Sequence, residues 1–94
     1  MLNIMVVDDE APIRDWLVYC IQKCPSATQV TSAVNGDEAY RMILETKPNV
    51  VFTDIRMPLM DGLELMSKVR EILPFTVFII LTNYAEFSYA KEAI

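Results

Sequence analysis

The chain alternates short apolar runs with longer segments of helical spacing, and this alternation constrains its fold more than any other feature. Apolar runs lie at 3–7, 49–53 and 76–81, and a weaker one lies at 28–33. Between them, apolar residues recur every three or four positions, which is typical of amphipathic helices. Each connection is long enough to hold one helix, so the strands are expected to pair in parallel. The sequence therefore predicts an α/β protein with helices on both faces of a parallel sheet.

The expected helices cover 12–24, 37–45, 61–73 and 85–94. Asn35 is a suitable N-cap for the second of them, because its side chain can accept from a free backbone N–H. The residues of the first helix expected to face the sheet are Ile13, Trp16, Leu17, Cys20, Ile21 and Cys24. Both cysteines are accordingly expected to be buried thiols.

Length and composition indicate one folded domain, covering 1–94. The chain has 94 residues, of which 53% are hydrophobic and 22% charged, so it is long enough for one core and too short for two domains. A net charge of -5 argues against direct contact with nucleic acid. Since no apolar run is long enough to cross a bilayer, we expect no membrane contact and a cytoplasmic protein.

Acidic and hydroxyl side chains follow three of the predicted strands. Asp8 and Asp9 come directly after the first strand, Asp54 ends the third, and Thr82 follows the fourth. Ligands of open parallel sheets bind beyond the carboxyl ends of the strands. We therefore expect these four side chains to converge on one site.

A cluster of this kind needs a cation. Two carboxylates about 4 Å apart repel by roughly 4 kcal/mol at an effective dielectric constant near 20. Oxygen ligands beside a shallow cleft favour Mg²⁺, which keeps several waters and commonly shares its shell with a phosphoryl group. The chain has no histidine, so chemistry here depends on carboxylates and hydroxyls. Asp54 is the best candidate nucleophile, and Thr82 can donate to a phosphoryl oxygen.

Three motifs resemble the receiver domain of two-component response regulators. They are Val-Val-Asp-Asp-Glu at 6–10, Thr-Asp-Ile-Arg-Met-Pro-Leu-Met-Asp-Gly at 53–62 and Leu-Thr-Asn-Tyr-Ala-Glu-Phe at 81–87. The middle motif is the most specific, and the resemblance extends over the whole chain. It implies a flavodoxin-like doubly wound sheet with strand order 2-1-3-4. It also implies a phosphorelay function in signal transduction.

The resemblance implies a role for each site residue. Asp54 would be the phosphoacceptor and Asp9 a direct Mg²⁺ ligand. Asp8 would act on the metal through a water molecule, and the backbone carbonyl of Arg56 would be a further ligand. Thr82 would be the switch hydroxyl that moves toward the phosphoryl group.

Other positions of the motifs shape or flank this site. Pro58 and Gly62 would shape the loop after the acceptor. The side chains of Arg56 and Tyr84 would flank the site, where control of hydrolysis is expected. Asn83 stands where receivers usually have Gly or Ala.

The chain departs from the family pattern at its C-terminal end, because the fifth strand and helix are missing. The Lys that ends this strand in receivers is missing with it, so we expect impaired phosphorylation. The strand at 77–81 would then be an apolar sheet edge, and such edges recruit other strands. We expect self-association through it, weakened by Glu or Lys in place of Ile79.

The sequence thus predicts a phosphoacceptor module rather than an enzyme, although it would assist its own phosphorylation and dephosphorylation. A sensor histidine kinase would be its phosphoryl donor. The helix at 85–94 resembles receivers joined to AraC-family DNA-binding output domains, so transcription regulation is the expected output. Two alternatives stay open: a receiver-like module that dimerises without phosphorylation, and a small phosphatase with an Asp nucleophile. Against the phosphatase, Arg56 stands where such enzymes usually have a second Asp.

Overall fold

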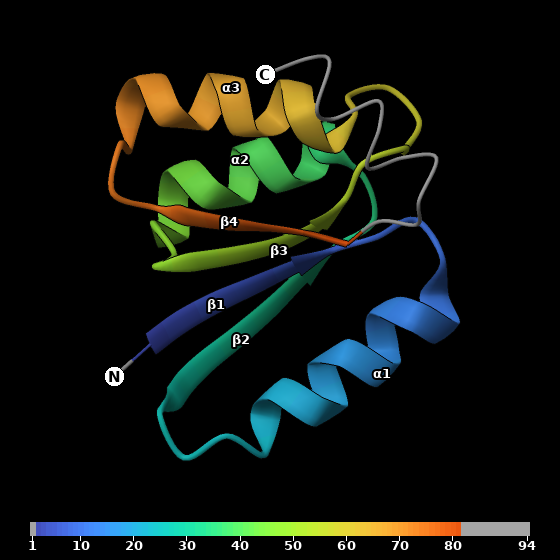
Figure 1. The fold of residues 1–94 in the computed structure, drawn as a ribbon, viewed down its shortest axis with the longest axis vertical. Helices are drawn as coiled ribbons and strands as arrows, with labels where there is room; N and C mark the ends of the chain where they lie inside the picture. Colours follow the sequence, from blue (N-terminus) through green and yellow to red (C-terminus); the bar gives the residue numbers. More distant parts are fainter. Residues whose placement is uncertain (1, 82–94) are drawn as a thin grey trace.

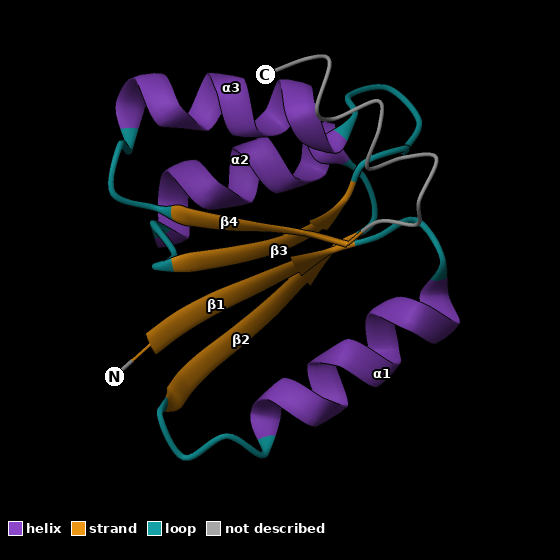
Figure 2. Cartoon of the chain, in the orientation of Figure 1, coloured by secondary structure: helices purple, strands orange, loops and turns teal. Residues whose placement is uncertain are grey.

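Strands and helices alternate along residues 2–81, which the computed structural model describes apart from the side chain of Thr28 (Figure 2). The strands are β1 (Leu2–Val7), β2 (Ala27–Ala33), β3 (Val50–Asp54) and β4 (Val77–Leu81). The helices are α1 (Ala11–Gln22), α2 (Gly36–Thr46) and α3 (Gly62–Ile72). None of the helices in this range is long and apolar enough to cross a membrane. The predicted alternation is confirmed here, while the helix expected over 85–94 lies outside the described residues.

The described strands form one parallel sheet in the order β2-β1-β3-β4. In this register Ile4 of β1 lies between Val30 of β2 and Val50 of β3. Figure 1 shows α2 and α3 on one face of the sheet and α1 on the other. The fold class and strand order predicted from the sequence are therefore confirmed. The absence of a fifth strand–helix unit stays a prediction.

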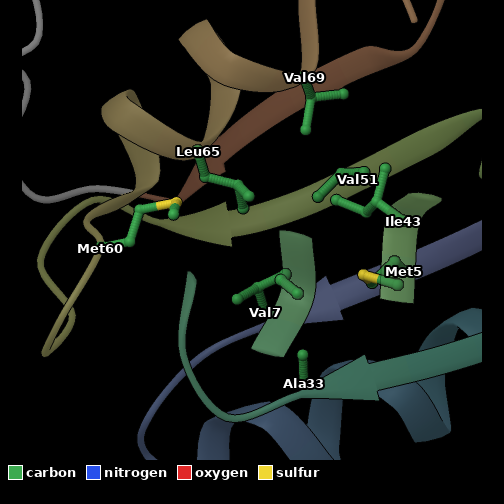
Figure 3. Packing of buried hydrophobic residues seen from close by; sticks show 9 residues of the cluster. Met5, Val7, Ala33, Ile43, Val51, Met60, Leu65 and Val69 are labelled. Atoms are coloured by element: carbon green, nitrogen blue, oxygen red, sulfur yellow. The ribbon is translucent and has the colours of Figure 1, made fainter. Parts of the chain in front are cut away.

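The main core lies between the sheet and the pair α2 and α3 (Figure 3). Each strand places alternate side chains on this face, and both helices turn an apolar stripe toward it. Its buried members are Met5, Val7, Ala33, Ala39, Ile43, Val51, Met60, Leu65 and Val69. Full burial of such a side chain contributes about 1.5–3 kcal/mol to the free energy of folding. The cluster therefore holds the sheet against α2 and α3.

Helix α1 packs less deeply than the sequence predicted. Trp16 is 64% exposed, and within the described chain α1 has no fully buried residue. The half-buried residues of α1 are Arg14, Leu17, Val18 and Ile21. Ile13, Cys20 and Cys24 are exposed, so the prediction of buried thiols was wrong. The periodicity gave a helix, but its apolar residues cover more of the circumference than the sheet contacts.

The N-termini of α2 and α3 are fixed by side-chain caps. The Asn35 side chain accepts from the backbone N–H of Glu38 at 2.8 Å, which confirms the predicted cap of α2. The Asp61 carboxylate accepts from the backbone N–H of Glu64, also at 2.8 Å, at the start of α3. Such caps satisfy backbone donors that have no partner inside the helix. They fix where the loop after β2 enters α2 and where the loop after β3 enters α3.

Candidate functional site

The acidic residues predicted to converge do meet at the carboxyl ends of two neighbouring strands. β1 and β3 pair in register up to Val7 and Thr53. The chain continues from β1 into Asp8 and Asp9, while Asp54 is the last residue of β3. Parallel pairing therefore brings acids from distant parts of the sequence to one edge of the sheet.

A fourth acid, Glu10, joins this cluster. Asp8, Asp9, Glu10 and Asp54 each offer a carboxylate oxygen, and these oxygens all lie within 4.8 Å of one another. Asp8 is buried, Asp54 is half-buried, and Asp9 and Glu10 are exposed. The sequence reasoning missed Glu10 as a site residue, and its position directly after Asp9 was the available signal.

Asp8 is a structural as well as an acidic member of the cluster. It is 2% exposed, and its Oδ1 accepts from the backbone N–H of Glu10 at 2.9 Å. Its own backbone N–H donates to the carbonyl of Ala33 on β2 at 3.2 Å. A buried carboxylate needs such donors to offset its lost hydration. These bonds hold the turn from β1 into α1, with Asp9 at its exposed tip.

Hydrogen bonds from its two neighbours in the chain, Thr53 and Ile55, hold Asp54 at the end of β3. The backbone N–H of Ile55 donates to Asp54 Oδ1 at 2.7 Å, and the Thr53 hydroxyl donates to the Asp54 carbonyl at 2.9 Å. Ile55 itself is fully buried against α3. The Asp54 carboxylate thus projects from a backbone segment that has little room to move.

Two glycines allow the loop after Asp54 to pack closely. A Cβ on Gly62 would lie 2.1 Å from the Asp54 carbonyl oxygen, and the Gly62 N–H donates to the Ile55 carbonyl at 2.7 Å. A Cβ on Gly36 would lie 2.2 Å from the Met60 carbonyl oxygen. Only glycine tolerates such approaches between backbones. The structure therefore gives a physical reason for Gly62 in the motif and adds Gly36, which the sequence reasoning did not single out.

The chemistry of the donor set fits a small divalent cation. All the gathered ligand atoms are carboxylate oxygens, which hard cations such as Mg²⁺ prefer. Without a cation, each pair of carboxylates at about 4 Å costs roughly 4 kcal/mol at an effective dielectric constant near 20. The exposure of Asp9 and Glu10 leaves room for metal-bound water.

Several predicted site residues are not tested by this geometry. Thr82 lies outside the described residues, and so do Asn83 and Tyr84. Arg56 is exposed in the loop after β3. The ligand role of its carbonyl, like the roles of the acids as ligands and acceptor, stays a prediction.

Comparison with known proteins identifies a family. A model of the response regulator receiver domain matches residues 4–94. The transcriptional regulatory protein YesN of Bacillus subtilis is 43% identical over 95 aligned positions, which cover 100% of this chain and 26% of YesN. The sensory transduction protein LytT of Oceanobacillus iheyensis is 35% identical, over 98% of this chain and 37% of LytT. The chain thus spans between a quarter and two fifths of these relatives.

Solved structures agree with this match. A two-component transcriptional regulator AraC from Clostridium phytofermentans superposes with a TM-score of 0.87 at 37% identity, over 95% of this chain and 73% of that one. The REC domain of AraT, a response regulator from Geobacillus stearothermophilus, superposes with a TM-score of 0.85 at 38% identity, over 98% and 72% of the two chains. The sequence comparison and the structural comparison therefore both identify response regulators.

Proposed function

Because this chain belongs to the response regulator receiver family, we propose that it accepts a phosphoryl group on Asp54 and relays that event to an output domain. One observation carries the choice of Asp54. It is the member of the acid cluster that projects from a strand inside the sheet, held by the N–H of Ile55, while the other three share one turn.

The proposed reaction transfers a phosphoryl group from a phosphohistidine of a sensor kinase. An Asp54 carboxylate oxygen forms a bond to phosphorus, the phosphorus–nitrogen bond breaks, and the electron pair leaves with the imidazole. The product is an acyl phosphate on Asp54. Hydrolysis by water returns the carboxylate and releases inorganic phosphate. The chain would assist both steps on itself without turning over an external substrate.

Asp9 and Asp54 would bind Mg²⁺ directly, with Asp8 acting through water and the Arg56 carbonyl as a further ligand. The cation, when bound, neutralises charge on the acids and on the phosphoryl oxygens. Buried Asp8 suits an indirect role, since its Oδ1 already accepts from Glu10. Exposed Glu10 is close enough to the other acids to share the same hydration shell. Thr82 would supply the switch hydroxyl.

The test is phosphorylation by a small acyl-phosphate donor, read by intact-protein mass spectrometry. We expect the chain to gain one phosphoryl group in the presence of Mg²⁺, and none after Mg²⁺ is chelated. Asp54→Asn should abolish the gain, while Asp61→Asn, at the N-cap of α3, should retain it. Modification of Asp54→Asn to the level of the parent chain would disprove the assignment of the acceptor.

A histidine kinase and a DNA-binding output domain are the proposed partners of the longer protein. Support comes from relatives described as transcriptional regulators, of which this chain matches only a part. The net charge of -5 makes this part of the protein unsuited to bind nucleic acid itself. A cytoplasmic location would suit both partners.

A signalling role is preferred to a phosphatase. Arg56 stands two residues beyond Asp54, where phosphatases of this type usually have a second acid, and family membership favours the signalling module. A turnover assay with a simple phosphate ester separates the two. Sustained release of phosphate would favour the enzyme.

We also propose self-association through the edge of β4. Among the described strands, β4 is paired on one side only, with β3. Phe75, just before it, is 93% exposed, and Val77 and Ile79 are exposed as well. Apolar edges with free backbone groups recruit other strands. Sedimentation should show a dimer at high concentration, and a monomer throughout would contradict the proposal.

A further inference from the structure

Helix α1 begins without the kind of cap found on α2 and α3. Its N-cap residue, Glu10, makes no side-chain cap bond in the described structure, and its first turn carries no acidic residue. The turn from Asp8 to Glu10 therefore depends on other contacts for its shape. This matters because the turn carries three of the four clustered acids.

Arg14 supplies two of those contacts, one on each side of Asp9. Its Nη1 donates to the backbone carbonyl of Asp8 at 2.8 Å. Its backbone N–H donates to the carbonyl of Glu10 at 3.0 Å. The second bond is the ordinary backbone bond of the first helical turn, so the contact that depends on the Arg14 side chain is the one to the Asp8 carbonyl, in the peptide that precedes Asp9. Arg14 is half-buried, and a charge-assisted hydrogen bond shielded from water is stronger than an exposed one.

We propose that Arg14 is a positioning residue for the cation site. Its guanidinium fixes the Asp8 carbonyl, and so the peptide plane that joins Asp8 to Asp9, with the Asp9 carboxylate turned toward Asp54. The inference rests on the proposed Mg²⁺-dependent function and concerns how this chain prepares the site. The positioning role of Arg14 follows from its hydrogen bond to the Asp8 carbonyl, because Arg14 is not itself a member of the acid cluster.

A simple counter-charge role would have the opposite consequence. If Arg14 only offset the repulsion among the acids, it would compete with the cation, and its removal would tighten Mg²⁺ binding. If it positions Asp9, its removal loosens the turn and weakens binding. The sign of the change in Mg²⁺ affinity therefore separates the two roles.

The experiment measures Mg²⁺ binding to the full chain by isothermal titration calorimetry, with thermal unfolding recorded with and without Mg²⁺. Arg14→Gln removes the charge and stops short of the Asp8 carbonyl. Arg14→Lys keeps a positive charge and a donor of similar reach, which suffices for a single hydrogen bond. Arg41→Gln is the matched control, because it removes the same charge from an exposed ion pair with Asp37 on α2. Arg14→Met is a second test variant for the case that Arg14→Gln does not fold. It removes the charge and retains the aliphatic part of the side chain.

We expect Arg14→Gln to weaken Mg²⁺ binding about tenfold, the effect of losing one hydrogen bond to a charged group. Arg14→Lys should recover most of the loss, and Arg41→Gln should stay near the parent value. Binding by Arg14→Gln or Arg14→Met at least as tight as in the parent would overturn the inference, as would a Lys variant no better than Gln. A parent chain that fails to bind Mg²⁺, or that binds it equally well as Asp9→Asn, would instead count against the proposed function.

Discussion

The face of the sheet covered by α2 and α3 encloses a continuous apolar cluster, whereas the face covered by α1 leaves Trp16 64% exposed. The same strands contribute to both faces, so the difference comes from the helices. Two helices with narrow apolar stripes bury their side chains against the sheet on one side. On the other, α1 is the one helix of residues 2–81 that contacts the sheet, along β1 and β2, as Figure 1 shows.

This difference divides the candidate site into two parts held by different forces. Asp54, the proposed acceptor, leads into the packed face, where Ile55 is buried and Gly62 touches the backbone of Asp54. The acids of the turn after β1 lead into α1 and are held by hydrogen bonds from Arg14 and Glu10. Apolar packing therefore fixes Asp54, the proposed acceptor, and polar bonds fix the acids of the turn after β1.

The largest expected effect compares one apolar residue from each face. Leu65→Ala, at a fully buried position of α3, should lower the free energy of unfolding by about 3 kcal/mol through lost burial and the cavity left behind. Trp16→Ala, on exposed α1 surface, should cost less than about 1 kcal/mol. Urea denaturation of both variants measures the difference. Equal losses would mean that the α1 face is covered in solution, and the contrast between the faces would fail.

A second prediction tests the close backbone contact on the packed face. Gly62→Ala puts a Cβ against the Asp54 carbonyl, which cannot move without displacing β3 or α3. We expect a loss of about 1–3 kcal/mol, together with slower phosphorylation of Asp54. Ser67→Ala, at an exposed position of the same helix, is the control and should stay within about 0.5 kcal/mol of the parent. A Gly62→Ala chain as stable as the parent would show that the loop between β3 and α3 can shift to accommodate a Cβ.

The sequence predicted the parallel sheet and the meeting of Asp8, Asp9 and Asp54 from general rules, whereas the strand order was implied by the resemblance to receivers. Buried parallel strands appear as apolar runs, and their carboxyl ends meet at one edge. The cap by Asn35 was equally local, since it depends on one side chain and the next turn. Features of this kind can be predicted without knowing the tertiary contacts of the segment.

The sequence did not predict which side of α1 would be buried or how the acid turn is held. Helical spacing gives the apolar residues of α1, but their burial depends on how much of the helix the sheet contacts. The bond from Arg14 to the Asp8 carbonyl joins residues six apart through a long flexible side chain, which no periodicity records. The contact of Gly36 with Met60 joins the start of α2 to the loop before α3, and it depends on the final packing of α2 against α3.

A third prediction concerns the edge of the sheet formed by β4, on the opposite side of the sheet from β2. Ile79→Lys places a charge on β4 at a side chain that is 40% exposed, and it should raise the dissociation constant of the proposed dimer about tenfold. Gln29→Lys makes a comparable charge change at an exposed position of β2, on the opposite edge of the sheet. Sedimentation velocity over a concentration series compares the two. If Gln29→Lys disrupts association as much as Ile79→Lys does, the β4 edge is not the interface.

The smallest expected effect compares the starts of two helices, measured in chelator so that cation binding plays no part. Asn35→Ala removes the cap of α2 and should cost about 1 kcal/mol of unfolding free energy. Glu10→Ala removes no cap bond described at the start of α1 and withdraws one charge from the acid cluster, so its cost should stay below about 0.5 kcal/mol. Equal costs would mean that Glu10 caps α1 in solution. A cap bond from Glu10 would then stabilise the turn around Asp9 together with the bond from Arg14 to the Asp8 carbonyl.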